Sequence, residues 1–253
     1  MSAPEPAPPI LEVDSLRVRY GKFEAVKGVS FSLARGGILG IVGESGSGKS
    51  TIAKTLMGLE KPSAGRIVRR SKSIQMVFQD AVGSLNPRMT VRQTLEEALR
   101  HAKGGGTARF ADGVRGLLSL VGLGENVLAQ YPREMSGGQC QRVSVARALA
   151  CSPEILVADE PVSALDVSVQ ARVLNLLRDL RRDLGLSILL IAHDLAVVKN
   201  VCDSICVMEK GVFVDGGDAK TVFESPRSGY TKRLLAAVPD VDRALAAQGR
   251  HGA

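Results

Sequence analysis

Residues Gly43–Ser50 read G-E-S-G-S-G-K-S, and this stretch decides the fold of the chain. It matches the phosphate-binding pattern G-x-x-x-x-G-K-[ST]. The apolar run Ile38–Val42 before it predicts a buried strand, and residues 51–57 after it predict a helix that ends at Gly58. A glycine-rich turn that matched by coincidence would lack this strand–loop–helix context. The sequence therefore predicts a nucleoside triphosphate site.

Each residue type in the loop has a chemical purpose. The glycines let backbone N–H groups point at phosphate oxygens, and the following helix contributes the partial positive charge of its N-terminus. Lys49 can reach the β- and γ-phosphates, and the Ser50 hydroxyl can bind Mg²⁺. The predicted nucleotide-contacting residues are Gly43, Glu44, Ser45, Gly46, Ser47, Gly48, Lys49, Ser50 and Thr51.

Length and composition indicate a globular protein without a membrane span. Of the 253 residues, 45% are hydrophobic and 23% are charged, which is ordinary for a globular chain. No run approaches the ~18 apolar residues that span a bilayer. The proline-rich stretch over residues 1–9 lacks the apolar core of a signal peptide, so we expect a disordered lead-in there. These features predict a cytoplasmic protein whose membrane role comes through a partner.

Charge and cysteine content argue against two other classes of protein. The net charge of +7 is spread along the chain, and the one tight basic cluster, Arg66–Lys72, is short. A basic surface near an anionic inner leaflet, or near triphosphate, explains the charge sufficiently, so we expect no nucleic-acid partner. The four cysteines form no C-x-x-C pair, which favours reduced thiols over a metal site.

The hydrophobic pattern changes character along the chain. Residues Ile10–Leu33 alternate as two strands do, and they predict an antiparallel sheet beside the nucleotide core. Residues 90–150 have helical spacing, while the continuous apolar runs Ile155–Ala158 and Leu186–Ala192 predict strands of a parallel sheet. We therefore expect an α/β fold: a P-loop NTPase core with a mainly parallel sheet, an antiparallel β subdomain and an inserted helical subdomain.

Polar residues follow the predicted parallel strands. Asp159 can hold Mg²⁺ opposite Ser50, and Glu160 can polarise an attacking water. An Asp-Glu pair also caps helices, but its combination with the phosphate-binding loop favours catalysis. His193 and Gln79 also end strands, at the sheet edge where ligands bind in open α/β folds. We expect His193 to contact the γ-phosphate and Gln79 to orient water or Mg²⁺, although a lone histidine at the end of a strand is more often structural.

A second anion-binding feature lies inside the helical insert. Residues Met135–Gln139 read M-S-G-G-Q, in which the serine and glutamine form an S-x-x-Q capping box on a helix that runs to Leu149. A capped helix start with two glycines is itself an anion site. Its place in the insert suggests that a second chain brings it to the nucleotide. The residues concerned are Ser136, Gly137, Gly138 and Gln139.

From Leu11 to Val238 the sequence resembles the ATP-binding-cassette (ABC) ATPases of transporters. M-S-G-G-Q is similar to the family signature L-S-G-G-Q, I-L-V-A-D-E-P to Walker B, and Ser163–Asp166 to the D-loop. The resemblance implies that Tyr20 stacks on adenine, and that ATP and Mg²⁺ are the cofactors. It also implies catalytic roles for Lys49, Gln79, Glu160 and His193, and metal contacts for Ser50, Gln79 and Asp159.

Within the family, Q-M-V-F-Q-D, the segment Ser84–Val91 and the tail Pro226–Pro239 resemble the importers of oligopeptides, dipeptides and nickel. Two departures are Ser228-Gly229 in place of the usual His-Pro, and a short stretch between Gly65 and Ile74. The resemblance implies two ATPase chains, the same or similar, that pair head-to-tail around ATP. It further implies two permease subunits, an indirect solute-binding protein, and a peripheral position on the inner face of the cell membrane. The solute itself is not determined.

Other readings remain beside this one. A soluble ABC ATPase acting on nucleic acid or ribosomes would usually carry two cassettes or long coiled-coil insertions. A non-hydrolysing cassette would not need the intact Lys49, Asp159, Glu160 and His193. We expect the apolar Leu85 to lie on a surface for the permease, with burial in the subdomain core as the alternative. The expected boundaries are a lead-in over 1–9, an ABC ATPase domain over 10–238, with its helical subdomain at about 90–150, and a tail over 239–253.

Overall fold

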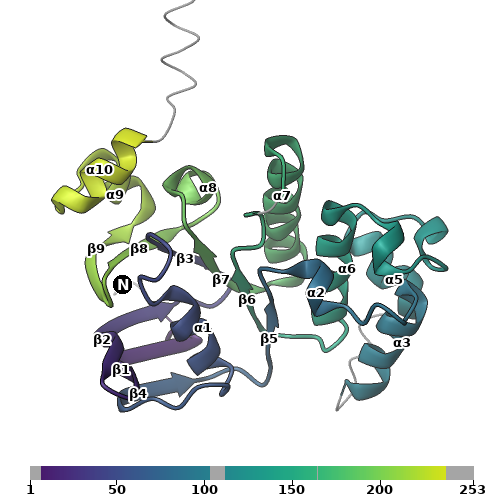
Figure 1. Cartoon of the computed structure of the whole chain (residues 1–253), viewed down its shortest axis with the longest axis horizontal. Helices are drawn as coiled ribbons and strands as arrows, with labels where there is room; N and C mark the ends of the chain where they lie inside the picture. Colours follow the sequence, from purple (N-terminus) through teal and green to yellow (C-terminus); the bar gives the residue numbers. More distant parts are fainter. Residues whose placement is uncertain (1–6, 103–111, 164, 238–253) are drawn as a thin grey trace, which may run out of the picture.

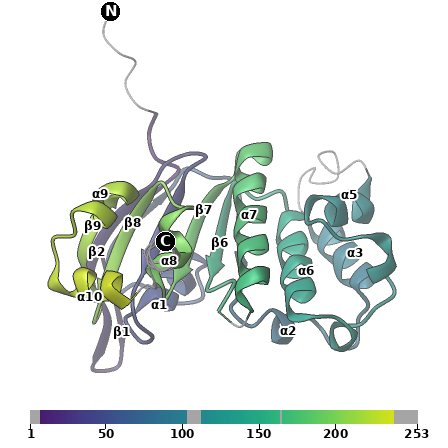
Figure 2. The ribbon, with the colours of Figure 1, turned by 90° about the horizontal axis from the view of Figure 1, so that it is seen from above.

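The computed structural model describes residues 7–102, 112–163 and 165–237. It consists of an α/β part and a helical part that lie side by side in both views (Figures 1 and 2). Most of the expected lead-in, the whole of the expected tail over 239–253, and the glycine run at residues 104–106 lie outside the described residues. The described residues therefore cover most of the expected domain over residues 10–238.

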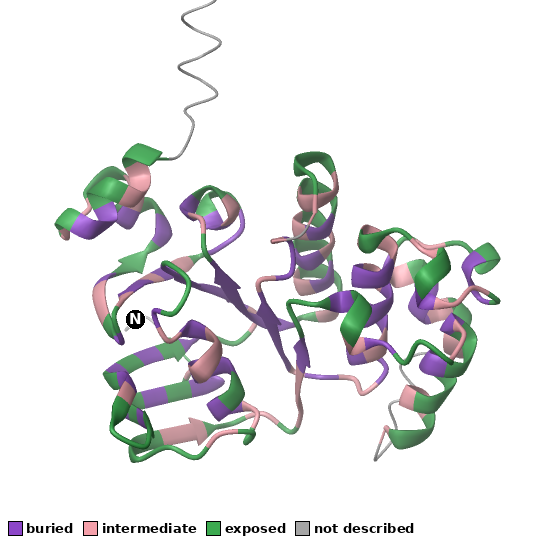
Figure 3. Ribbon diagram, viewed as in Figure 1, coloured by how far each residue is buried: buried purple, intermediate pink, exposed green. Residues whose placement is uncertain are grey.

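A six-stranded sheet forms the centre of the α/β part, in the order β5-β6-β7-β3-β8-β9. The first five strands run parallel, and β9 pairs antiparallel with β8. Every residue of β3, β6 and β7 is buried, which Figure 3 shows as purple strands, and which explains their continuous apolar sequences. The bounds are β3 Ile38–Val42, β5 Ile74–Val77, β6 Ile155–Asp159, β7 Ser187–Ala192, β8 Ser204–Glu209 and β9 Val212–Asp218.

The predicted antiparallel subdomain is confirmed, with one strand more than the sequence indicated. Strands β1 (Leu11–Tyr20) and β2 (Phe23–Leu33) form the expected hairpin. Strand β4 (Ala64–Arg69) then pairs with the free side of β1, so the order is β2-β1-β4. The stretch Pro62–Gly65 has residues that are typical of a turn, but Ala64 already begins β4. Pairing with β1 overrides the weak local pattern of this largely exposed edge strand.

The helical part follows β5 and contains three longer helices among the described residues. Helix α6 (Gly137–Leu149) begins with the capping box predicted at Ser136, and α3 (Val91–His101) begins with another at Thr90, while α5 (Gly113–Leu120) packs beside them. A short helix α2 (Ala81–Ser84) lies between β5 and α3. The two 3₁₀ turns η1 and η2 span Glu125–Val127 and Pro132–Glu134.

The expectation of a surface-exposed Leu85 is wrong. Its side chain is only 3% exposed and belongs to the hydrophobic cluster that includes Val91 and Leu95 of α3. Helix α2 turns the chain so that Leu85 points into the subdomain, and burial of an apolar side chain is favourable. The alternative reading of core packing is therefore the correct one.

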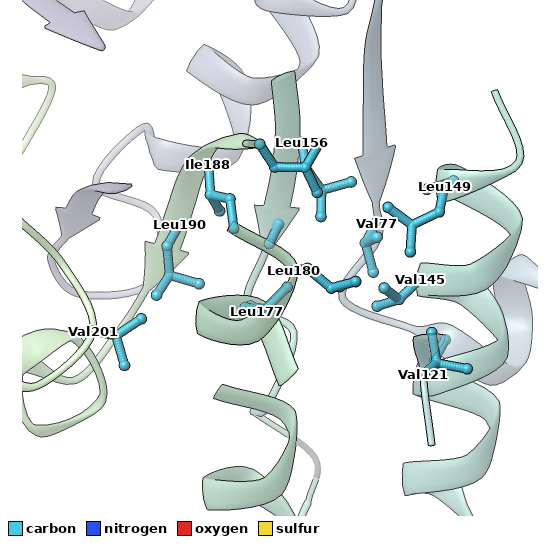
Figure 4. Packing of buried hydrophobic residues seen from close by; sticks show 14 of the residues in the cluster. Val77, Val121, Val145, Leu149, Leu156, Leu177, Leu180, Ile188, Leu190 and Val201 are labelled. Atoms are coloured by element: carbon cyan, nitrogen blue, oxygen red, sulfur yellow. The ribbon is translucent and has the colours of Figure 1, made fainter. Parts of the chain in front are cut away.

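The two parts share one core. The larger hydrophobic cluster joins one face of the central sheet to α7 (Val167–Leu184) and to the helical part. In Figure 4, Leu177 and Leu180 of α7 lie beside Leu156 and Ile188 of the sheet. A second cluster joins the other sheet face to the antiparallel subdomain. The remaining helices are α1 Lys49–Leu56, α8 Leu195–Lys199, α9 Ala219–Glu224 and α10 Gly229–Ala237.

The helices that the structure describes offer no candidate for a membrane span, because none is both long enough and apolar enough.

Candidate nucleotide-binding and catalytic site

The phosphate-binding loop lies between β3 and α1, as the sequence predicts. Gly43 packs so tightly against the backbone carbonyl of Met208 in β8 that a Cβ atom at this position would collide with it. Gly48 has φ 110° and touches the backbone of Ala25 in β2, a conformation and a space that suit glycine. The loop is thus shaped by strands on both sides of it.

The Lys49 ammonium group is held inside the loop. Its Nζ atom donates to the carbonyl oxygens of Gly43 at 2.6 Å and Glu44 at 2.9 Å, and the side chain is 3% exposed. Burial lowers the pKa of Lys49, and the carboxylates of Glu160 and Asp159 oppose that shift. The ammonium group therefore lies beside two acids, at the end of the sheet where the loop begins.

Ser50 and Asp159 meet although they are far apart in the sequence. The Ser50 hydroxyl donates to Oδ1 of Asp159 at 3.1 Å. Burial raises the pKa of Asp159, which is 6% exposed, and the hydrogen bond from Ser50 opposes the shift. A hydroxyl and a carboxylate that converge from opposite elements are hard oxygen donors, and this donor set fits Mg²⁺.

Glu160 joins the predicted catalytic residues. Its carboxylate lies 3.7 Å from Nζ of Lys49 and 3.7 Å from Nδ1 of His193, and it accepts a hydrogen bond from Nε2 of Gln79 at 3.0 Å. Residue Glu160 has φ 45°, which is uncommon outside glycine and turns the chain sharply after β6. The polar residues after β5, β6 and β7 therefore form one cluster.

Tyr20 stands at the turn end of the β1–β2 hairpin, just before the turn at Gly21-Lys22. It is 42% exposed and is paired in register with Phe23, which is 65% exposed. Strand β2 continues from this tip to Ala25, which contacts the phosphate-binding loop at Gly48. The ring of Tyr20 is thus free for stacking at the edge of the loop region, and the described contacts do not bury it.

The segment Ser136–Gln139 lies elsewhere in the molecule. Its serine hydroxyl accepts from the Gln139 N–H, and the Gln139 side chain accepts from the Ser136 N–H, so the capping box is complete within α6. Helices α1 and α6 lie on opposite sides of β6 in both views (Figures 1 and 2). The structure does not bring this segment to the phosphate-binding loop of its own chain.

Two contacts to the loop were missed by sequence reasoning. The Tyr230 hydroxyl of α10 accepts from the Glu44 N–H at 3.0 Å, and the Gly211 N–H donates to the Ser47 carbonyl at 2.9 Å. Tyr230 was noted only as part of a tail that resembles a family. No local pattern links a residue near the end of the chain to a loop near its beginning.

A phosphate-binding loop after one parallel strand and an Asp-Glu pair after a neighbouring one define a P-loop nucleoside triphosphatase. The sequence also matches the model of the ABC transporter family over residues 26–163. It is 44% identical over 241 residues to the oligopeptide transport ATP-binding protein OppF of Lactococcus lactis, covering 89% of this chain and 76% of that protein.

Solved structures agree with this relationship. CbiO1 of Clostridium perfringens, part of the ABC transporter complex CbiONQ, matches with a TM-score of 0.77 at 28% identity, covering 95% of this chain and 100% of that chain. The ATP-binding cassette MJ0796, in a dimeric post-hydrolysis state with ADP and Pi, matches with a TM-score of 0.70 at 28% identity, covering 83% and 98% of the two chains. This chain therefore belongs to the ABC transporter family, as a nucleotide-binding ATPase.

Proposed function

We propose that this chain is the ATP-hydrolysing subunit of a membrane importer for peptides. The observation that carries the proposal is the cluster around Glu160, which brings Lys49, Gln79 and His193 to the phosphate-binding loop. Such a cluster supplies a cation for phosphate oxygens and a base for water in one place. The assignment of peptides rests on the similarity to OppF, an oligopeptide transport protein in Lactococcus lactis.

Each residue of the cluster has a distinct role in this proposal. Lys49 neutralises charge on the terminal phosphates, and Tyr20 stacks on the base. Glu160 accepts the proton of the attacking water, with His193 and Gln79 orienting the reacting groups through their contacts to its carboxylate. Ser50 and Asp159, with Gln79 nearby, would hold Mg²⁺. Mg²⁺, when bound, neutralises the charge that develops between the β- and γ-phosphoryl oxygens.

The second half of the site comes from another ATPase chain, the same or similar. Ser136 and Gly137 are exposed, and the start of α6 presents backbone N–H groups with a partial positive charge. In a head-to-tail pair, this segment of one chain would complete the phosphate site of the other. The dimeric state of the similar cassette MJ0796 supports the pairing. The cassette would span residues 10–238, with its helical subdomain at about 90–150.

The permease subunits would bind a groove between the two parts of the chain. The groove has a volume of about 690 Å³ and is lined from β5, α2, α3 and α6 by residues that include Phe78, Arg147 and Cys151. The Phe78 side chain is 39% exposed, and Val82 of α2 is 48% exposed. Apolar side chains left open beside a hollow suit a partner helix. Leu85, being buried, is not part of this surface. Binding there would place the chain peripherally on the inner face of the membrane.

Co-purification with the permeases encoded beside the gene tests this function. The wild-type complex in vesicles should hydrolyse Mg²⁺-ATP and take up peptide, while Lys49→Ala should do neither. Phe78→Asp should keep ATP binding but lower the yield of complex. Val212→Asp is a matched control, because Val212 is 38% exposed on β9. Wild-type yield and transport in the Phe78 variant would exclude the groove, and peptide-independent activity on RNA would point to a soluble ABC ATPase.

A further inference from the structure

The peptide unit between Gly43 and Glu44 is held from both of its sides. Its carbonyl oxygen, on Gly43, accepts from Nζ of Lys49 at 2.6 Å. Its N–H group, on Glu44, donates to the Tyr230 hydroxyl at 3.0 Å. Because the N–H and C=O of a trans peptide point in opposite directions, the two bonds fix the rotation of one plane. Lys49 and Tyr230 are therefore coupled through a single peptide.

The position of Tyr230 is itself well defined. The side chain is 6% exposed and belongs to the larger hydrophobic cluster, while the Arg233 guanidinium lies 5.7 Å from the ring centroid. The Ser228 hydroxyl accepts from the Tyr230 N–H at 3.1 Å, at the start of α10. A tyrosine with a packed ring and a fixed backbone holds its hydroxyl at one place with little loss of entropy.

Asp215 of β9 connects this helix start to the central sheet. Its Oδ2 atom accepts from the backbone N–H groups of Arg227 at 2.8 Å and Ser228 at 3.1 Å. The carboxylate is 9% exposed, so these bonds are shielded from water. The sheet therefore supports the turn, the turn supports α10, and α10 supports the hydroxyl.

The same C-terminal segment contacts the loop at two further points. The Met208 carbonyl packs against Gly43, and the Gly211 N–H donates to the Ser47 carbonyl at 2.9 Å. Both residues belong to the β8–β9 hairpin or its turn. Met208, Gly211 and Tyr230 thus contact the phosphate-binding loop at three separate points.

We propose that Tyr230 is a positioning residue for the phosphate-binding loop, acting on Lys49 through the Gly43–Glu44 peptide. Without the hydroxyl, this peptide can rotate, its carbonyl leaves Lys49, and the ammonium shifts toward the Glu160 carboxylate 3.7 Å away. Nucleotide binding must then restore the geometry of the loop, and the free energy that this costs lowers the affinity for nucleotide. The inference rests on the proposed nucleotide site and adds the C-terminal helix to it.

The test is Tyr230→Phe in the full chain, which keeps the ring and removes the hydroxyl. The Kd of a fluorescent ATP analogue should rise about three- to tenfold, in line with the loss of one buried hydrogen bond. In the assembled transporter, KM for ATP should rise by a similar factor with kcat nearly unchanged. Tyr131→Phe is the matched control, because Tyr131 lies just before η2 in the helical part. It should leave both constants unchanged.

Hydrogen exchange of the nucleotide-free chain gives a second, independent readout. Exchange in the peptide containing residues 43–47 should be faster in Tyr230→Phe than in the wild type. Exchange in the strands of the sheets should be unchanged. Equal exchange and equal Kd would overturn the positioning role. Faster exchange throughout the chain would show a general loss of stability instead, and would also overturn it. Absence of ATP binding to the wild type would refute the nucleotide site, while exchange would still decide the role of Tyr230.

Discussion

The α/β part and the helical part each carry one of the two segments that we propose bind phosphate, and the surroundings of these segments differ. In the α/β part, Lys49, Ser50, Asp159 and Glu160 contact one another across the ends of the strands. In the helical part, the polar groups of Ser136–Gln139 bond within their own helix start, and this segment faces outward. One segment is preorganised by contacts from the whole fold, and the other is preorganised by four consecutive residues.

This difference teaches how the two segments would divide their work. A loop that must hold a highly charged phosphate chain needs buried countercharges, which only a folded sheet edge can supply. A helix start offers N–H groups and a partial charge without any tertiary support, so it can be presented to another molecule. The comparison predicts that lesions in the α/β part act within a chain, whereas lesions at Ser136 act on a partner.

The largest effect is expected at Glu160. Glu160→Gln keeps the size of the side chain and its contact with Gln79, but it removes the proposed base. ATP binding should persist, while hydrolysis should be at least ~100-fold slower, and a dimer should accumulate in ATP. Rapid-quench ATPase assays and sedimentation measure the two outcomes. Near-normal turnover would remove Glu160 from the role of base.

Mixed dimers test the comparison directly. A chain with Ser136→Arg and a chain with Lys49→Ala should each be inactive alone. Random pairing yields dimers with one intact site and one site with both lesions, so activity should recover to about a quarter of the wild-type level if the sites are independent. Tagged chains would confirm that mixed dimers form. An inactive mixture despite such dimers would contradict a shared site.

The capping boxes at the starts of α3 and α6 allow a sharper comparison. Thr90→Ala and Ser136→Ala each remove one side-chain acceptor from a backbone N–H, of Gln93 and Gln139 respectively. Both should lower the free energy of unfolding by about 0.5–2 kcal/mol, measured with urea. Only Ser136→Ala should also slow ATP hydrolysis by the assembled transporter, by at least about tenfold. Equal ATPase loss in both variants would assign Ser136 a structural role alone.

The smallest expected effect is a change in the thermal stability of the chain when Asp159 is replaced. Burial raises the pKa of this carboxyl group in the folded chain, so the folded chain holds the proton more tightly than the unfolded chain. Stability therefore falls as pH rises from the ordinary aspartate pKa through the raised one. The neutral Asp159→Asn should melt about 1–4 °C higher at pH 7 without nucleotide, although its ATPase activity is lost.

Scanning calorimetry at several pH values provides the check on this sign. The advantage of Asp159→Asn should shrink as pH falls through the raised pKa, because the wild-type carboxyl group is then also neutral. A lower melting temperature of the variant at pH 7 would show that the ionised carboxylate stabilises the nucleotide-free chain, most simply through its bond with Ser50.

Sequence patterns predicted the elements that depend on neighbouring residues. The strand before the phosphate-binding loop, the helix after it and the capping box at Ser136 are all confirmed. Strand β4 and helix α2 were not predicted, because an exposed edge strand and a single helical turn carry little hydrophobic periodicity. Leu85 was misjudged for a related reason, since a lone apolar residue in a loop has no pattern that shows which way it points.

The sequence by itself determined the phosphate-binding loop, the acids after the strand, and the signature-like helix start. These features arise from short runs of residues whose backbone chemistry is local. Only the tertiary structure decided that the Glu160 carboxylate contacts Lys49, Gln79 and His193. It also decided that the Tyr230 hydroxyl binds the Gly43–Glu44 peptide, which contacts Lys49 as well. Such contacts depend on the order of strands in the sheet and on the packing of the last helix. Both are set by burial summed over the whole chain rather than by any one segment.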